Sequence, residues 1–161
     1  MKRERILLEY DSFENEDQLP AQSRELLEKA KASLNQAYAP YSRFQVAAAL
    51  RLANGQIIAG TNQENAAYPS GLCAERTAVF YAGSAFPGIA IEEILVIARK
   101  EGGSELLAAC PCGACRQVIQ EAESRQVQDI RLVFRLEKTG FIRLDSVRDT
   151  LPFRFDPASL S

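Results

Sequence analysis

The sequence feature that most constrains the fold is a buried-strand pattern at residues 92–100, EEILVIARK, lying between two segments with helical spacing. Those helical segments run from 73 to 85 and from 112 to about 124, and another strand pattern follows at 129–137. Strand–helix–strand alternation after residue 56 predicts parallel neighbours joined by right-handed crossovers.

Hairpins are predicted at both ends of this alternation. ANG at 53–55 separates RFQVAAALRL from QIIAG, and KTG at 138–140 separates DIRLVFRLE from FIRLDSV. A first helix is predicted from Ser23 to Tyr38, with Ser23 as its N-cap and Pro40 ending it. We therefore expect an α/β fold, a three-layer α/β/α sandwich whose mixed sheet has five strands.

Residues 1–22 are interpreted as an N-terminal extension, and residues 23–161 as one domain. Within the extension, RILLEY is either a short strand or an apolar anchor, whereas DSFENEDQLP is predicted to be loop. No role is assigned to it.

Charge and hydropathy argue against nucleic acid and membranes as binding partners. The formal net charge of −2 offers no basic footprint for nucleic acid. No signal-peptide pattern is present, and no apolar run approaches the roughly 18 residues of a membrane span. These patterns favour a cytoplasmic protein with no nucleic-acid or membrane partner.

Histidine is absent from the chain, which excludes Ser-His and Cys-His nucleophile pairs and His-based zinc motifs. Acid–base chemistry near neutral pH then requires a carboxylate, lysine, tyrosine or metal-bound water. Zinc, if bound, requires thiolate or carboxylate ligands.

The four cysteines indicate where such a site lies. Cys112 and Cys115 are three residues apart at a predicted helix start, so both sulfurs face one point. Taken alone, this CxxC pattern is about as typical of a redox pair as of a metal-binding pair. Cys73, just before the other helix, adds a third thiol, and three ligands leave zinc an open position, as in catalytic sites. Cys110 is awkwardly placed to bind the same ion, because only Pro111 separates it from Cys112.

Two charged residues follow Cys73 directly. Glu75 is interpreted as a proton carrier beside the metal, provided that the first turn lets it share a side with Cys73. Three thiolates and Zn²⁺ sum to −1, so a guanidinium at Arg76 would withdraw excess negative charge from the sulfurs. Outside such a site, Arg76 would be an ordinary surface residue.

The motifs CAERTA and PCGACRQ together resemble the zinc nucleoside deaminases, specifically cytidine deaminases of the small, homotetrameric, three-cysteine type. APYSRFQVAAAL, GTNQENAAYPSGLCAERTA and LPFRFDP extend the resemblance to nearly the whole chain after residue 22. It implies hydrolytic deamination of cytidine and 2′-deoxycytidine to the uridines and ammonia. It also implies that Cys73, Cys112 and Cys115 bind Zn²⁺ and that Glu75 moves protons.

The resemblance also implies a nucleoside site. Asn62 and Glu64 match a pair that hydrogen-bonds the ribose, Phe44 an aromatic that packs on the pyrimidine, and Ala74 a backbone contact to the base. From the residues alone, Asn62 and Glu64 point the same way at a strand end and suit a sugar diol, although an ordinary polar loop fits as well. Phe44 is equally compatible with a core aromatic.

A C-terminal phenylalanine is implied to reach a neighbouring subunit's site, so that sites are completed across a homotetramer. Phe155 is the candidate, with Phe153 in the same LPFRF motif as the alternative. Cys110 stands where serine is common, and is either inert or oxidation-sensitive.

Three other functions are compatible with the same motifs. A blasticidin-type deaminase has the same core, and sequence excludes it least firmly. A deaminase of bases within RNA or DNA is disfavoured by the lack of a basic stripe. A structural zinc module for protein interaction leaves Glu75 and the open position without purpose.

Overall fold

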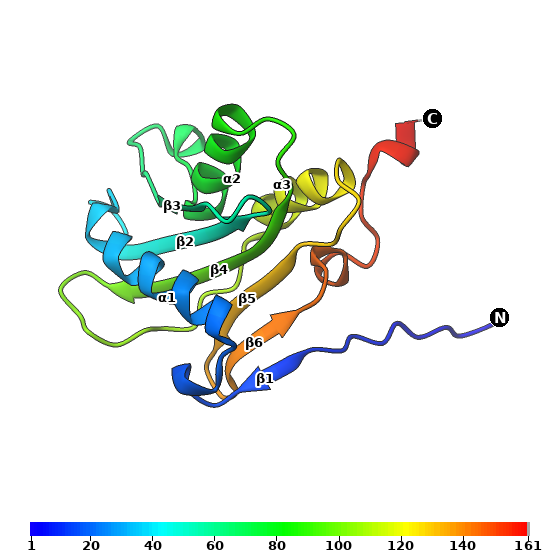
Figure 1. Ribbon diagram of the computed structural model, residues 1–161, viewed down its shortest axis with the longest axis horizontal. Helices are drawn as coiled ribbons and strands as arrows, with labels where there is room; N and C mark the ends of the chain where they lie inside the picture. The colour runs from blue at the N-terminus through cyan, green and yellow to red at the C-terminus, as the bar shows by residue number, and fades with distance from the viewer. Residues whose placement is uncertain (161) are drawn as a thin grey trace.

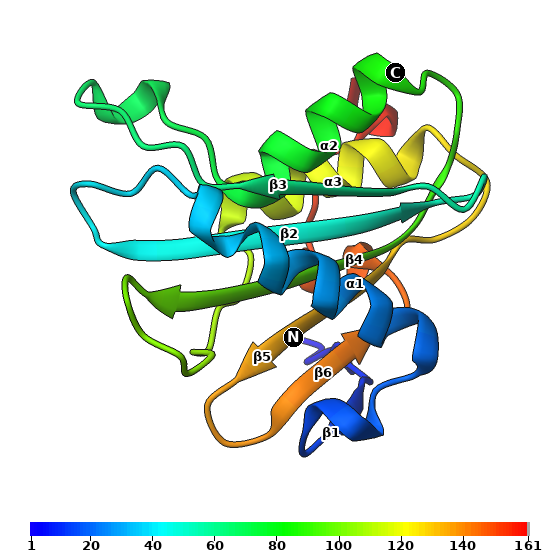
Figure 2. The ribbon, with the colours of Figure 1, turned by 60° about the vertical axis from the view of Figure 1, so that its left-hand side comes forward.

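Helices cover both faces of one mixed sheet in the structure, a computed structural model that describes residues 1–160 (Figure 1). The strands are β1 (Asp11–Phe13), β2 (Phe44–Leu52), β3 (Ile57–Thr61), β4 (Ile91–Lys100), β5 (Arg131–Leu136) and β6 (Gly140–Leu144). The helices are α1 (Ala21–Ser33), α2 (Ala74–Ala85) and α3 (Gly113–Ser124). Figure 2 shows α1 on one face of the sheet and α2 beside α3 on the other. The expected α/β fold with a mixed sheet is confirmed.

The sheet has six strands rather than the five predicted, in the order β1-β6-β5-β4-β2-β3. The sixth is β1, in a stretch predicted to be loop, and it pairs antiparallel with β6 from Asp11 opposite Arg143 to Phe13 opposite Phe141. Gly140 permits this pairing, because its φ is +78° and a Cβ there would lie 2.3 Å from the Phe13 carbonyl oxygen. RILLEY forms no strand, and residues 1–10 have no regular secondary structure.

The predicted parallel pairing holds for β4 and β5, whereas β3 and β4 are not neighbours. Strand β2 lies between them and pairs antiparallel with both. Helix α2 therefore crosses over β2 on its way from β3 to β4. It packs tightly on β3, since a Cβ at Gly60 would lie 2.5 Å from the Ala78 nitrogen. This contact fixes where the N-terminus of α2 lies.

The central strands are apolar on both faces, because each face is covered by helices. In β4, Ile94 and Val96 pack in the cluster under α2 and α3, and Leu95 and Ile97 in the cluster under α1. Leu95 is fully buried, so its truncation to alanine would cost about 2–5 kcal/mol of folding free energy.

Helix boundaries differ slightly from those predicted. Helix α1 begins at Ala21, two residues early, with Pro20 in the N-cap position. Ser23 is therefore inside the helix, and its buried Oγ has no hydrogen-bond partner among the described residues. The helix ends at Ser33 and continues as a 3₁₀ turn to Gln36. Within residues 1–160, none of the helices combines the length and hydropathy that a bilayer span requires.

Candidate active site

Two helix N-termini bring three cysteines together. Cys73 and Cys112 are the N-cap residues of α2 and α3, and Cys115 lies in the first turn of α3. An N-cap side chain usually accepts a hydrogen bond from its helix, but neither cysteine does so. Both sulfurs are therefore left for other partners.

The sulfur positions suit one zinc ion. The Sγ atoms of Cys73 and Cys112 are 3.9 Å apart and those of Cys112 and Cys115 3.5 Å, with all three within 4.8 Å of one another. Tetrahedral zinc with bonds of about 2.3 Å would hold its sulfur ligands about 3.8 Å apart. The donor set therefore fits Zn²⁺, with three protein ligands.

Cys110 lies outside this group of sulfurs. Its Sγ instead accepts a 2.7 Å hydrogen bond from Arg116 Nη2. The same guanidinium donates through Nε to the Pro111 carbonyl oxygen at 2.8 Å and through Nη1 to that of Thr150 at 3.3 Å. Cys110 is thus held beside the site as a separate, exposed thiol.

The sulfur cluster favours negative charge. Hydrogen bonding from the Cys115 thiol, followed by that from Arg76, lowers the pKa of Cys73 to about 5. The same bond raises the pKa of Cys115, because its proton is shared with Cys73. The free N–H groups at both helix N-termini also stabilise a thiolate. A metal cation would displace the remaining thiol protons.

Glu75 is buried beside these sulfurs, with 4% of its surface exposed. Burial raises its pKa above the usual value near 4.5, and the nearby Cys73 adds to the effect. A carboxyl group tuned toward neutral pH can both accept and donate a proton. The N-cap and first-turn geometry places Cys73 and Glu75 on the same cavity, which two regular helical positions at this spacing would not do.

Arg76 contacts the cluster from its edge. Its Nη2 lies 3.7 Å from the Cys73 Sγ and 3.4 Å from the Gly71 carbonyl oxygen. The Cys73 thiolate raises the pKa of Arg76, as expected for a cation beside a negative sulfur. The guanidinium is therefore placed to draw negative charge from the Cys73 sulfur.

A cavity of about 980 Å³ opens over the cysteines. Its lining includes eight of the ten predicted site residues: Phe44, Asn62, Glu64, Cys73, Ala74, Glu75, Arg76 and Cys112. Cys115 is buried beneath it and joins the site through its sulfur. Phe155 is not part of the lining; it is exposed on the C-terminal segment, where its carbonyl oxygen accepts a hydrogen bond from Gln117.

The two polar residues predicted to bind a sugar also organise the cavity wall. Asn62 Oδ1 accepts from the Val46 N–H at 2.8 Å, and its Nδ2 donates to the Phe44 carbonyl oxygen at 2.9 Å. Asn62 thereby fixes the start of β2, from which Phe44 lines the cavity.

Glu64 fixes the loop before β2. Its Oε2 accepts from the backbone N–H groups of Tyr41 and Ser42 at 2.9 and 3.3 Å. Hydrogen bonding by the Ser42 side chain, with these backbone bonds, lowers the pKa of Glu64. The cavity wall therefore carries a stable negative charge.

The lining also contains residues for which no role was predicted, among them Tyr41, Tyr68, Val96, Ala108 and Ala109. Tyr68 is 91% exposed and stands five residues before Cys73. The feature that could have identified Tyr68 is its place in the sequence, as an aromatic residue close to a metal-binding motif. Val96 gave no signal, because its strand pattern is that of any core residue.

Comparison with known proteins places this geometry in a family. Residues 20–129 match the model for the cytidine and deoxycytidylate deaminase zinc-binding region. The cytidine deaminase of Sporosarcina psychrophila is 39% identical over 137 residues, which span 84% of this chain and 93% of that protein. That of Halalkalibacterium halodurans is 44% identical over 96 residues, 60% of this chain and 68% of that protein.

Solved structures agree with the sequence comparison. The crystal structure of cytidine deaminase from Burkholderia pseudomallei has a TM-score of 0.69 and 37% identity, covering 85% of this chain and all of that one. That from Mycobacterium tuberculosis has a TM-score of 0.64 and 28% identity, covering 84% and 98%. This chain therefore belongs to the cytidine and deoxycytidylate deaminase family.

Proposed function

We propose that this chain catalyses the zinc-dependent hydrolytic deamination of cytidine and 2′-deoxycytidine to uridine and 2′-deoxyuridine, with release of ammonia. The observation that carries the proposal is the convergence of three cysteine sulfurs and the buried Glu75 on one cavity. Residues 23–161 are assigned to this activity. The family match and the curated relatives support it.

The chemistry requires a nucleophile and a proton carrier. Zinc held by Cys73, Cys112 and Cys115 supplies Lewis-acid activation of the attacking water. Water adds at C4 of the pyrimidine, and the exocyclic amine leaves as ammonia. Glu75 takes a proton from the nucleophile, delivers it to N3, and then carries a second proton to the departing amine. Its raised pKa suits both halves of this task.

Substrate recognition is assigned to the cavity wall. Phe44 packs against the pyrimidine, and the backbone at Ala74 contacts the base. Both backbone bonds to Glu64 end on Oε2, which leaves Oε1 for a ribose hydroxyl. The Asn62 Nδ2 carries a second hydrogen beyond the one given to Phe44. The Glu64 carboxylate repels phosphate, so a free nucleoside is favoured over a nucleotide.

A homotetramer with shared sites is part of the proposal. Phe155 and Phe153 are 58% and 93% exposed, and neither lines the cavity of its own chain. Phe155 of one subunit is proposed to complete a neighbour's cavity. Light scattering should then give about four times the chain mass of 17.8 kDa. Phe155→Ala should raise KM for cytidine more than Phe153→Ala does.

The proposed reaction belongs to pyrimidine salvage, because it acts on free nucleosides. Three reduced cysteines are needed to bind the metal, and the cytoplasm keeps thiols reduced. We therefore assign the enzyme to the cytoplasm.

The deciding experiment incubates zinc-loaded protein with cytidine, deoxycytidine, CMP and blasticidin in parallel and follows the loss of absorbance. Turnover is expected for the two nucleosides and little for CMP. Glu64→Ala should raise KM for cytidine, whereas the exposed Glu105→Ala should not. Free cytosine, which lacks ribose, should remain an equally poor substrate for both variants. Absence of turnover with both nucleosides would refute the proposed function.

A further inference from the structure

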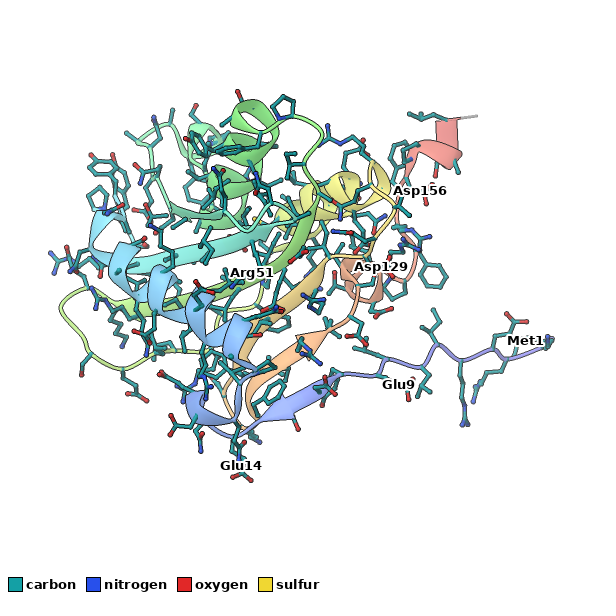
Figure 3. The ribbon with its side chains drawn as sticks, viewed as in Figure 1. Met1, Glu9, Glu14, Arg51, Asp129 and Asp156 are labelled. Carbon is teal, nitrogen blue, oxygen red and sulfur yellow. The ribbon has the colours of Figure 1, made fainter. Side chains whose placement is uncertain are left out.

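An N-terminal arm, residues 2–10, leaves the body of the molecule and exposes apolar side chains. Figure 1 shows the chain running outward from β1, and Figure 3 shows the side chains between Met1 and Glu9 standing clear of the sheet. Leu7 is 83% exposed, and Ile6, Leu8 and Tyr10 are also exposed. An apolar cluster of this kind on a protein surface marks an interaction site.

The arm continues into the edge strand of the sheet. Strand β1 pairs with β6 on one side and, among the described residues, has no strand on its other side. Such an edge presents unpaired N–H and C=O groups that template pairing with another chain. The arm and the outer edge of β1 therefore offer one extended pairing segment.

The charges of this segment are divided between its two ends. Before the apolar centre, the cations Lys2, Arg3 and Arg5 outnumber Glu4, which pairs with Lys2. After the centre come Glu9 and Asp11, and Asp11 also bonds to Arg143. A second copy of the segment, laid antiparallel, would bring the basic end of each copy beside the acidic end of the other. A parallel copy in register would place like charges opposite each other, which is destabilising.

We propose that residues 3–11 of two copies of this chain pair as antiparallel strands centred on Leu7. In this register Leu7 faces Leu7, and Ile6 faces Leu8 of the other copy. Arg5 faces Glu9, and this pair occurs twice because of the twofold symmetry. Asp11, the first residue of β1, faces Arg3 of the other copy, so the paired arms continue from the edge strand of each sheet. This pairing is independent of the active site and does not rest on the proposed function.

The register is specified by the sequence. Moving one copy by one residue in one direction places Ile6 opposite Glu9, and moving it in the other places Glu4 opposite Glu9. In the proposed register, by contrast, Ile6, Leu8 and Tyr10 share one face of the strand pair, because side chains alternate. An anionic lipid surface would attract only the basic end and repel the acidic one.

Cysteine cross-linking tests the register. In the full-length zinc-loaded protein, Leu7→Cys should form a disulfide between copies in a glutathione redox buffer, because directly opposed Cβ atoms lie about 4.5–5.5 Å apart. Arg3→Cys is the matched control, since the two Arg3 positions would be about 26 Å apart along the strands, eight residues at about 3.3 Å. Peptide mass spectrometry identifies the linkage, and the unmodified protein gives the background from Cys110.

Charge exchange tests the pairing itself. Adding Arg5→Glu to Leu7→Cys should slow cross-linking about tenfold, because two attractive pairs become repulsive. Adding Glu9→Arg as well should restore the rate, since the pairs are then exchanged at the original net charge. Lys138→Glu, an exposed change outside the arm, should leave the rate unaltered.

A second pair of variants keeps the test independent of position 7. Mixing Ile6→Cys with Leu8→Cys protein should give linked heterodimers faster than either protein alone gives homodimers. Zinc content and turnover should be unchanged in all variants. Equal rates for Leu7→Cys and Arg3→Cys, or no recovery on charge exchange, would overturn the proposal, as would partition of the arm onto anionic vesicles in place of cross-linking.

Discussion

The N-termini of α2 and α3 are built alike, each with a cysteine N-cap, Cys73 or Cys112, followed by an arginine, but the other side chains of their first turns differ. Arg76 lies 3.7 Å from the Sγ of Cys73, within the sulfur cluster. Arg116 lies 2.7 Å from the Sγ of Cys110, outside the cluster, and also binds two backbone carbonyl groups.

The residues that follow each cysteine N-cap account for the difference. The second residue of α2 is Glu75, whereas the second residue of α3 is Ala114. The third residue is Arg76 in α2 and Cys115 in α3. Helix α3 therefore supplies two sulfurs, and α2 supplies one sulfur with an acid–base group and a cation. In the proposed mechanism, α3 chiefly holds the metal and α2 chiefly directs the chemistry.

The largest expected effect distinguishes Cys112, the N-cap of α3, from Cys110, which lies two residues before it. Cys112→Ser should lose bound zinc and with it all measurable turnover, because a serine hydroxyl is not a thiolate ligand. Cys110→Ser should keep zinc at one ion per chain, since Cys110 lies outside the cluster. Elemental analysis of purified protein measures both. Loss of zinc from Cys110→Ser would show that the site is not limited to three sulfurs.

The next largest effect is expected at Glu75, whose counterpart in α3 is Ala114. Glu75→Gln should retain zinc and fold but lower kcat by about 10²–10⁴-fold, because the amide keeps the shape and cannot carry a proton. The measurement is steady-state turnover of cytidine by zinc-quantified protein. Near-normal kcat in a fully loaded variant would remove Glu75 from the mechanism.

A smaller effect is expected at the α2 arginine. Arg76→Gln should lower kcat by about 10–100-fold and move the rising limb of the kcat–pH profile to higher pH, because the sulfurs regain negative charge and the metal becomes a weaker Lewis acid. Adding Cys73→His should recover part of the loss, since a neutral imidazole removes that charge at its source. An unchanged kcat and pH profile for Arg76→Gln would make Arg76 an ordinary surface residue.

Much of the fold followed from local patterns in the sequence. The helices after Cys73 and Cys112 begin within a residue of their predicted starts, because their N-cap and turn signals are local. Strand β1 was missed because three residues carry no periodicity, and its pairing depends on Gly140 and Arg143, which are distant in sequence. The position of β2 between β3 and β4 depends likewise on long-range pairing.

Residue types and spacings pointed to the cysteines, Glu75 and Arg76 together. The nucleoside contacts at Phe44, Asn62, Glu64, Ala74 and Phe155 were implied by the family resemblance. Spacing did not reveal that Asn62 and Glu64 bind the backbone around Phe44 and Tyr41. A side chain's partner across the fold leaves no local pattern. The same reason explains why Tyr68 and Val96 of the cavity wall were not assigned.

The smallest expected effect is at the α3 arginine and concerns stability rather than turnover. Arg116 joins the start of α3 to the 3₁₀ turn at Val147–Thr150 through its bond to the Thr150 carbonyl oxygen, and holds the Pro111 carbonyl oxygen as well. Arg116→Gln would leave these acceptors without their charged donor. Such bonds contribute about 1.5–3 kcal/mol when buried, and less here because Arg116 is only partly buried.

We therefore expect Arg116→Gln to lower the free energy of unfolding by about 1–2 kcal/mol, measured by urea titration of the zinc-loaded protein. Zinc content, kcat and the kcat–pH profile should stay unchanged, because the guanidinium contacts a sulfur outside the cluster. Arg76→Gln should give the opposite combination, with altered kcat at nearly constant stability. If Arg116→Gln instead moved the kcat–pH profile, both arginines would act on the metal, and the contrast between the two helices would fail.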